Sequence, residues 1–105
     1  MEPFQTITPQ QAKRIMDSDP DCVILDVREV EEYVTGHVEN AIPFTLSQID
    51  AEFAAECIPS KDTRLLVYCK TGKRSRMACQ KLWSLGYRNL ANFGGVESWP
   101  YELTW

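Results

Sequence analysis

The stretch LLVYCKTGKRSRMACQKLWSLG, residues 65–86, indicates a strand, a short loop and a helix in direct succession. Residues 65–68 are apolar, as in a strand that is buried on both faces of a sheet. Apolar side chains then recur at the spacing of one helix face, and Gly86 follows where a left-handed helix C-terminus is expected. We therefore predict a buried strand that ends at Cys69 and a helix that begins after a polar loop.

The loop after this strand has the features of an anion site. Residues 69–73 lie where loop N–H groups and a helix N-terminus would converge, and such groups bind anions. Nearby dipoles and positive charge also favour the ionised form of a thiol, so we expect Cys69 to be stabilised as a thiolate. The alternative is an inert core cysteine, but a basic loop that contains glycine is an unusual place for one. The cationic side chains near Cys69 are Lys70, Lys73, Arg74 and Arg76.

The overall composition is that of one soluble globular domain. The chain has 105 residues, of which 44% are hydrophobic and 25% charged, and both fractions are ordinary for such a domain. We therefore expect a single domain over residues 1–105. No apolar run approaches the roughly 20 residues of a membrane helix, and residues 1–11 lack the features of a signal peptide. These observations predict a cytoplasmic protein with no membrane partner.

The charges are distributed unevenly along the chain. Residues 1–62 contain 13 acidic and 4 basic side chains, whereas residues 63–96 contain 7 basic side chains and no acidic one. A basic segment of this kind can bind nucleic acid. Here, however, the basic residues gather around a cysteine rather than along a stripe. We therefore expect a small anionic substrate and no nucleic-acid partner.

The other cysteines and the histidine give no sign of a metal or organic cofactor. Four cysteines could form two disulfides, but a reducing compartment weakens that interpretation, and the chain has no C-x-x-C pair. With one histidine in the chain, a Cys/His metal site is poorly supported. We expect Cys22, Cys57 and Cys79 to be core residues. Cys57 or Cys79 would act as a resolving thiol only if it lay close to Cys69.

The remaining segments alternate between helix and strand patterns. Thr8 has the properties of a helix N-cap, with a proline after it and a glutamine at the capping-box position, so we predict a helix over residues 8–17. Residues 22–27 form a near-continuous apolar run, which is typical of a strand in a parallel sheet. Further short elements are predicted at residues 1–7 (edge strand), 30–36 (helix), 41–42 (strand), 89–93 (strand) and 96–100 (helical turn).

One more helix is predicted between residues 47 and 57. Ser47 has the properties of its N-cap, with Asp50 at the N3 position. Phe53 and Cys57 would then share the inner face of this helix with other apolar residues.

Strands that alternate with helices predict a three-layer α/β domain with a parallel sheet. The functional crevice of such a sheet lies at the carboxyl ends of its strands, where Cys69 is placed. Asp26 and Arg28 come at the end of another strand, and ionisable groups beside a buried strand should be paired. We therefore predict an Asp26–Arg28 pair, and for His37 a turn-stabilising role.

Three stretches, in the order of the chain, resemble the motifs of rhodanese domains. They are Asp26-Val27-Arg28-Glu29 continuing to Tyr33, Gly36-His37 and Ala41-Ile42-Pro43; the loop Cys69-Lys70-Thr71-Gly72-Lys73-Arg74-Ser75; and Gly94-Gly95-Val96 with Trp99. The resemblance covers nearly the whole chain. It implies a rhodanese-like α/β/α fold with a central, mainly parallel five-stranded sheet. It also implies thiosulfate:acceptor sulfur transfer as the reference activity.

The resemblance implies a role for each loop residue. The Cys69 thiolate would attack the outer sulfur of thiosulfate, release sulfite and hold a persulfide, from which an acceptor takes the sulfur with ping-pong kinetics. The expected acceptors are cyanide or a thiol such as glutathione, thioredoxin or a protein thiol, and no cofactor is needed. The resemblance also places Arg28 near the rim of the pocket. The residues expected to bind the donor are Lys70, Thr71, Gly72, Lys73, Arg74 and Ser75.

The length of the loop distinguishes between sulfur and phosphorus chemistry. Phosphatases of related and unrelated folds use Cys-x5-Arg, whereas this chain has Cys69-x4-Arg74, with Ser75 at the next position. Residues 63–96 also contain no acidic residue that could act as a general acid on a loop. A phosphatase or arsenate reductase is therefore disfavoured. A sulfur relay or a non-enzymatic protein-binding module stays open as the alternative to a thiosulfate enzyme.

Overall fold

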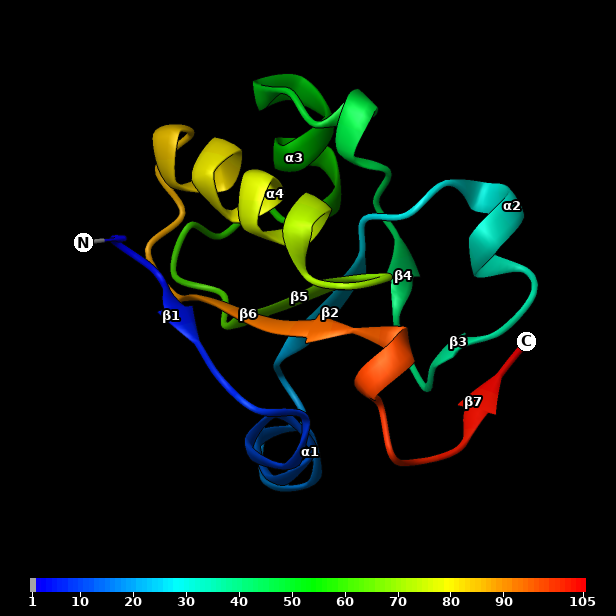
Figure 1. Cartoon of the computed structure of the whole chain (residues 1–105). Coiled ribbons are helices and arrows are strands. Elements are labelled where there is room, and N and C mark those ends of the chain that lie inside the picture. The colour runs from blue at the N-terminus through cyan, green and yellow to red at the C-terminus, as the bar shows by residue number, and fades with distance from the viewer. Residues whose placement is uncertain (1) are drawn as a thin grey trace.

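The structure, a computed structural model, describes residues 2–105 and has a parallel sheet at its centre. Within these residues the sheet has five strands in the order β1-β6-β5-β2-β4, all parallel (Figure 1). The predicted α/β class with a five-stranded parallel sheet is therefore confirmed. The strands are β1 (Gln5–Thr6), β2 (Val23–Asp26), β4 (Ile42–Pro43), β5 (Leu65–Cys69) and β6 (Leu90–Gly95).

The central strand β5 is the one that the apolar run predicted. All its residues are buried, and it pairs with β2 on one side and with β6 on the other. Its side chains alternate between two cores, as the strand period requires. Leu65 and Val67 belong to one core, and Leu66 and Tyr68 belong to the other. Cys69 comes last, at the carboxyl edge of the sheet.

Helices cover both faces of the sheet (Figure 1). Helix α1 (Pro9–Ser18) lies on one face, and α3 (Ala51–Cys57) and α4 (Lys73–Ser84) lie on the other. The capping box predicted for α1 is present, because the Gln11 N–H donates to Thr8 Oγ1 and the Thr8 N–H donates to Gln11 Oε1. Helix α4 ends before Gly86, whose φ is 104°, as predicted. No helix within the described residues is both long and apolar enough for a membrane span.

The prediction for residues 47–57 is wrong in two respects. A 3-10 turn, η1 (Leu46–Gln48), comes first, and α3 begins after Asp50, which is its N-cap and accepts a hydrogen bond from the Phe53 N–H at 2.8 Å. The buried residues here are Ala54 within α3 and Ile58 at its C-cap, and Phe53 packs against the same core as predicted. Cys57 is exposed rather than in the core, because it lies beside these buried residues in the last turn.

Several short elements follow or extend the predicted pattern. The edge strand predicted for residues 1–7 is confirmed at Gln5–Thr6, although Met1 lies outside the described residues. Strand β6 runs on to Gly95, two residues beyond its predicted end. The helical turns are α2 (Val30–Tyr33) and η2 (Val96–Ser98). An antiparallel pair of β3 (His37–Val38) with β7 (Leu103–Thr104) was not predicted, since two-residue strands show no alternation.

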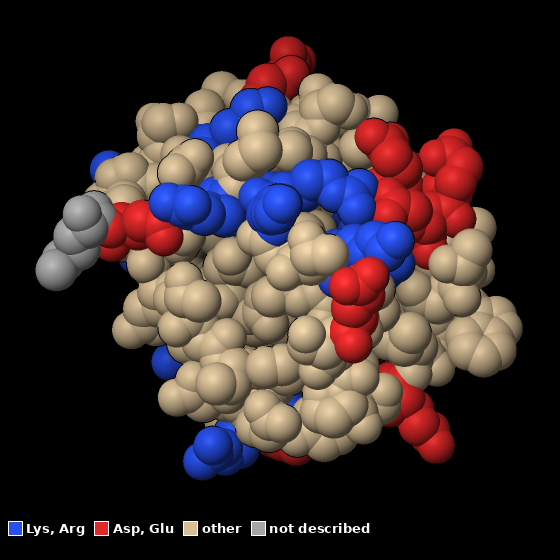
Figure 2. All heavy atoms as spheres, in the orientation of Figure 1, with Lys and Arg blue, Asp and Glu red and all other residues tan. Residues whose placement is uncertain are grey.

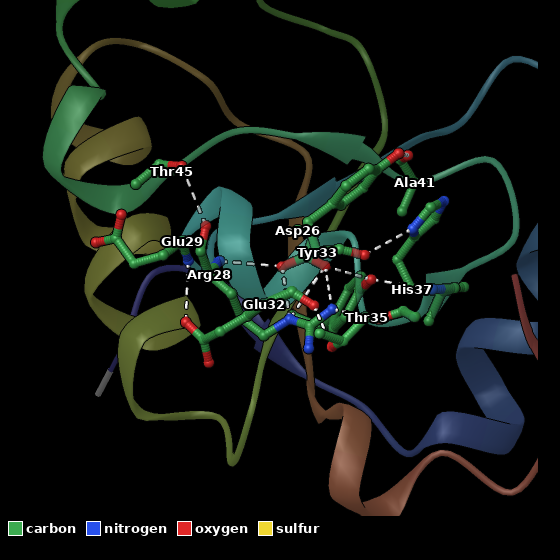
Figure 3. A network of polar contacts seen from close by, with 12 residues as sticks. Asp26, Arg28, Glu29, Glu32, Tyr33, Thr35, His37, Ala41 and Thr45 are labelled. Carbon is green, nitrogen blue, oxygen red and sulfur yellow. Dashed lines mark hydrogen bonds and ion pairs between the residues drawn. The ribbon is translucent and has the colours of Figure 1, made fainter. Parts of the chain in front are cut away.

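A buried ion pair supports the loop between β2 and β3. Arg28 donates through Nη2 to Asp26 Oδ2 at 2.7 Å and to the Gly36 carbonyl at 2.8 Å (Figure 3). Asp26 also accepts from the Tyr68 hydroxyl at 2.7 Å, and that hydroxyl accepts from the Val38 N–H at 3.0 Å. Asp26 and Arg28 are 0% and 5% exposed. The predicted Asp26–Arg28 pair is confirmed.

We expect Arg28→Met to lower the free energy of unfolding by about 3–5 kcal/mol, because it leaves the Asp26 carboxylate buried without its cation. Urea denaturation measures this loss. The matched control is Arg14→Met on the exposed side of α1, for which a change within about 0.5 kcal/mol is expected. Equal effects of the two substitutions would contradict the structural role of the pair.

Candidate active site

Cys69 lies at the junction of β5 and the loop that leads into α4. Its Sγ accepts a hydrogen bond from the Gly72 N–H at 3.0 Å. Gly72 is the N-cap of α4 and has φ 110°, a backbone conformation that residues with a side chain rarely adopt. The glycine in the loop therefore allows the backbone to turn its N–H toward the sulfur.

The end of β6 packs against this loop through its backbone. A Cβ atom on Gly95 would lie 1.9 Å from the Lys70 carbonyl oxygen, so a side chain at this position would displace the loop. The same carbonyl accepts a hydrogen bond from the Glu97 N–H at 3.2 Å. The Gly94-Gly95 stretch thus braces the cysteine loop from behind.

Hydrogen bonds stabilise the anionic form of the sulfur. Burial by itself raises the pKa of Cys69, but hydrogen bonds from the Ser75 side chain and from the N–H groups of residues 75, 72 and 71 outweigh it and lower the pKa below its ordinary value. Cys79 shows the contrast, because burial raises its pKa to about 12. The geometry of the loop, rather than burial, distinguishes the two cysteines.

Most of the basic side chains near Cys69 form ion pairs with glutamates. Arg74 donates through Nη1 and Nη2 to the two carboxylate oxygens of Glu32, at 2.7 and 2.9 Å. This contact lowers the pKa of Glu32 to about 2. Lys70 Nζ lies 3.8 Å from Glu97, and Arg76 pairs with Glu2.

The pairing is visible on the surface, where a band of Lys and Arg side chains lies directly beside a group of acidic ones (Figure 2). Residues 63–96 contain no acid, so the sequence offered the loop no local partner. Glu32 reaches Arg74 from α2, and a separation of 42 residues hides such a contact from sequence analysis. The site is therefore less positive than the sequence predicts.

Asn92 on β6 is a second residue that sequence analysis missed. Its Oδ1 accepts from the Ser75 hydroxyl at 2.7 Å and from the Gly94 N–H at 3.0 Å, and its Nδ2 donates to the Gly72 carbonyl at 3.2 Å. A polar side chain inside an apolar strand pattern is the signal that could have indicated it, because burial requires hydrogen-bond partners.

The predicted site residues fall into two groups. Cys69, Gly72 and Ser75 are held together by the contacts at the sulfur, whereas the side chains of Thr71, Lys70 and Lys73 are exposed around them. Arg74 lies between the groups, half-buried against Glu32.

Arg28 and His37 have contacts of their own. The guanidinium of Arg28 is occupied by Asp26 and the Gly36 carbonyl. His37 stacks on Tyr33 with 3.7 Å between ring centroids, and its Nδ1 lies 3.0 Å from the Tyr33 carbonyl oxygen, as a turn-stabilising role predicts (Figure 3). Within residues 2–105, no three His, Cys, Asp or Glu side chains gather as a metal site would require.

Comparison with known proteins gives the family. The family model of the rhodanese-like domain matches residues 8–101. This chain belongs to the rhodanese-like domain family. The family assignment agrees with the motifs in the loop and in β6.

Individual rhodanese-like relatives are similar at moderate identity. Thiosulfate sulfurtransferase PspE of Escherichia coli is 36% identical over 73 residues, which are 70% of this chain and 69% of the relative. A sulfurtransferase of Allochromatium vinosum is 30% identical over 89 residues, covering 84% of this chain and 79% of the relative. Other relatives are longer, and the chain spans 46% of one and 63% of another.

A solved structure shares the fold. It is a rhodanese with anions from Escherichia coli, which superposes with a TM-score of 0.71 at 32% identity and covers 78% of this chain and 95% of that chain.

We expect the pKa of the Cys69 thiol to lie below that of an ordinary exposed thiol, because the loop hydrogen bonds stabilise its anion. The ultraviolet absorbance of the thiolate, recorded as a difference between the wild-type protein and Cys69→Ser across a pH series, gives the midpoint. The difference for Cys79→Ser is expected to titrate near 12 and serves as the control. A midpoint for Cys69 at or above that of an ordinary thiol would contradict the role of the loop hydrogen bonds.

Proposed function

We propose that this protein is a sulfurtransferase that carries sulfane sulfur on Cys69. Membership of the rhodanese-like family and the sulfurtransferases among its relatives support sulfur transfer in general. The observation that carries the proposal is the Cys69 sulfur itself, which accepts the Gly72 N–H at 3.0 Å at the start of α4 and has a lowered pKa. For Cys79, which is also buried, burial raises the pKa instead.

The reaction proceeds in two displacements, with thiosulfate as the proposed donor. The Cys69 thiolate attacks the outer sulfur of thiosulfate, the bond between the two thiosulfate sulfurs breaks, and sulfite leaves with the electron pair. Cys69 then holds a persulfide. An acceptor thiolate attacks the outer sulfur of that persulfide, takes it and restores the Cys69 thiolate. Loop N–H groups around the sulfur stabilise each anionic sulfur species.

The exposed cations of the loop account for an anionic donor. Lys73 and Lys70 lie at the surface beside Cys69, where they attract a dianion from solvent. The related rhodanese with anions is consistent with such a site. Acceptors such as glutathione, thioredoxin or a protein thiol, and a cytoplasmic location, stay predictions.

Brief incubation with thiosulfate followed by intact mass measurement tests the proposal. We expect a gain of one sulfur atom, about 32 Da, on the wild-type protein, because covalent catalysis leaves the persulfide on the enzyme. The Cys69→Ser variant is expected to gain nothing, and addition of a thiol acceptor should remove the sulfur from the wild-type protein. If the wild-type mass stays constant with thiosulfate but rises with a persulfide donor, the protein is a sulfur relay.

We expect Glu32→Gln to lower the KM for thiosulfate about threefold or more at low salt, with little change in kcat. The substitution removes a negative charge that repels the dianion and that occupies Arg74. Steady-state kinetics at two salt concentrations measure the effect, which should shrink as salt rises. Glu31→Gln on the same helix is the matched control. Glu31 is exposed, and its substitution removes the same charge but leaves the Arg74–Glu32 contact in place. Equal changes in both variants would show that the Arg74 contact is immaterial.

A further inference from the structure

The Asn92 side chain has only one orientation that satisfies its neighbours. Asn92 is 6% exposed, and Oδ1 lies 3.0 Å from the Gly94 nitrogen. A backbone N–H can only donate, so the carbonyl end of the amide must face it. The NH₂ end then donates to the Gly72 carbonyl at 3.2 Å. The Asn92 amide therefore faces Ser75 with its carbonyl oxygen, which can accept a hydrogen bond but cannot donate one.

Ser75 has one hydroxyl hydrogen and several acceptors around it. Asn92 Oδ1 lies at 2.7 Å, the Gly72 carbonyl at 3.1 Å, and the Gly94 carbonyl at 3.4 Å. The Cys69 sulfur lies at 3.5 Å. The shortest contact is to an atom that carries no hydrogen, so the hydroxyl donates there and its lone pairs face the sulfur. The neutral thiol of Cys69 can donate its own S–H to the Ser75 oxygen.

We propose that Asn92 is a positioning residue that keeps the Ser75 hydroxyl turned away from the Cys69 sulfur until that sulfur becomes anionic. A thiolate is a stronger acceptor than a neutral amide oxygen, because its hydrogen bonds are charge-assisted. When the thiol loses its proton, rotation about the Cβ–Oγ bond of Ser75 brings the hydroxyl hydrogen to the sulfur. Only a hydrogen atom changes place, and the loop stays as it is.

This inference deepens the proposed function. Its relevance to catalysis rests on that function, whereas the effect on the ionisation of Cys69 does not. The Ser75 hydroxyl supplies a donor to the sulfur in its anionic states, and Asn92 withholds that donor from the resting thiol. The ionisation of Cys69 can be measured without any sulfur donor. A failure of this inference is therefore distinguishable from a failure of sulfur transfer.

A purely structural role for Asn92 predicts the opposite sign. If Asn92 only held the loop, its removal would loosen the N–H groups at the sulfur and raise the pH at which Cys69 ionises. The Gly72 carbonyl, however, keeps the Arg76 N–H at 3.1 Å when the Asn92 amide is removed, so α4 still holds the loop. The charged groups around the loop are the same in every neutral variant: Lys70, Lys73 and Arg74 on the loop and α4, Glu32 on α2, and Glu97 on η2.

The test is a titration of Cys69 by thiolate absorbance in four proteins: wild type, Asn92→Ala, Ser75→Ala and the double variant. We expect Asn92→Ala to lower the midpoint by about half to one pH unit, which is three to ten times more thiolate below the midpoint. The substitution removes the shortest contact of the hydroxyl, and the remaining acceptors, the carbonyls of Gly72 and Gly94, lie farther away at 3.1 and 3.4 Å. Ser75→Ala should raise the midpoint. In the Ser75→Ala background, removal of Asn92 should have no effect.

Two results overturn the proposal. One is a midpoint for Asn92→Ala at or above the wild-type value, and the other is an equal shift with and without Ser75. If Asn92→Ala does not fold, as judged by circular dichroism, Asn92→Asp provides the measurement. Its carboxylate keeps the acceptor and holds the Ser75 hydroxyl more firmly, so the midpoint should rise further with Ser75 present than in the Ser75→Ala background, where charge repulsion alone acts. Asn89→Asp, on the exposed segment before β6, is the matched control and should leave the midpoint unchanged. An equal rise for Asn92→Asp with and without Ser75 overturns the proposal as well.

Discussion

The hydrogen bond from the Gly72 N–H to the Cys69 sulfur is the interaction on which the site depends. A buried thiol resists ionisation, because burial removes the water that would solvate its anion. The loop compensates with N–H groups that point inward, and this requires the positive φ of Gly72. The β6 backbone behind the loop must approach so closely that Gly95 can carry no side chain. The lowered pKa of Cys69 therefore follows from hydrogen bonds to the sulfur, from the Ser75 side chain and from the loop N–H groups.

In the function that we propose, the charges around the loop act on the sulfur donor. Arg74 and Glu32 neutralise one another across the gap between α4 and α2, which leaves Lys73 and Lys70 as the more exposed cations beside the sulfur. This side of the surface consequently carries charges of both signs (Figure 2). We propose that the strength of the Arg74–Glu32 contact affects the binding of an anionic donor, while the hydrogen bonds at Cys69 stay the same. In this proposal, attraction of the donor and stabilisation of the thiolate depend on different groups of the same loop.

A buried polar network lies near the carboxyl edge of the sheet, where Cys69 is also placed. Asp26, Arg28 and Tyr68 satisfy one another beneath the loop that leads to β3, so that ionisable groups can be buried without an unpaired charge. Tyr68 immediately precedes Cys69 along β5. Because the carboxyl ends of parallel strands meet at one edge, this network, the cysteine loop and Asn92 lie together although they are far apart in the chain.

Local sequence determined the strand that ends at Cys69, the helix after it, the capping box at Thr8 and the order of strands and helices, since each depends on neighbouring residues and short-range periodicity. It also located the glycines that the loop requires. Which groups face each other was decided by the tertiary structure alone. Glu32 reaches Arg74, and Asn92 reaches Ser75, only because the parallel sheet brings distant segments to the same edge. The exposure of Cys57 was likewise decided by the tertiary structure, in which Ala54 and Ile58 are buried and Cys57 is not. Contacts between residues far apart in the chain leave no local pattern, so their partners can be named only once the fold is known.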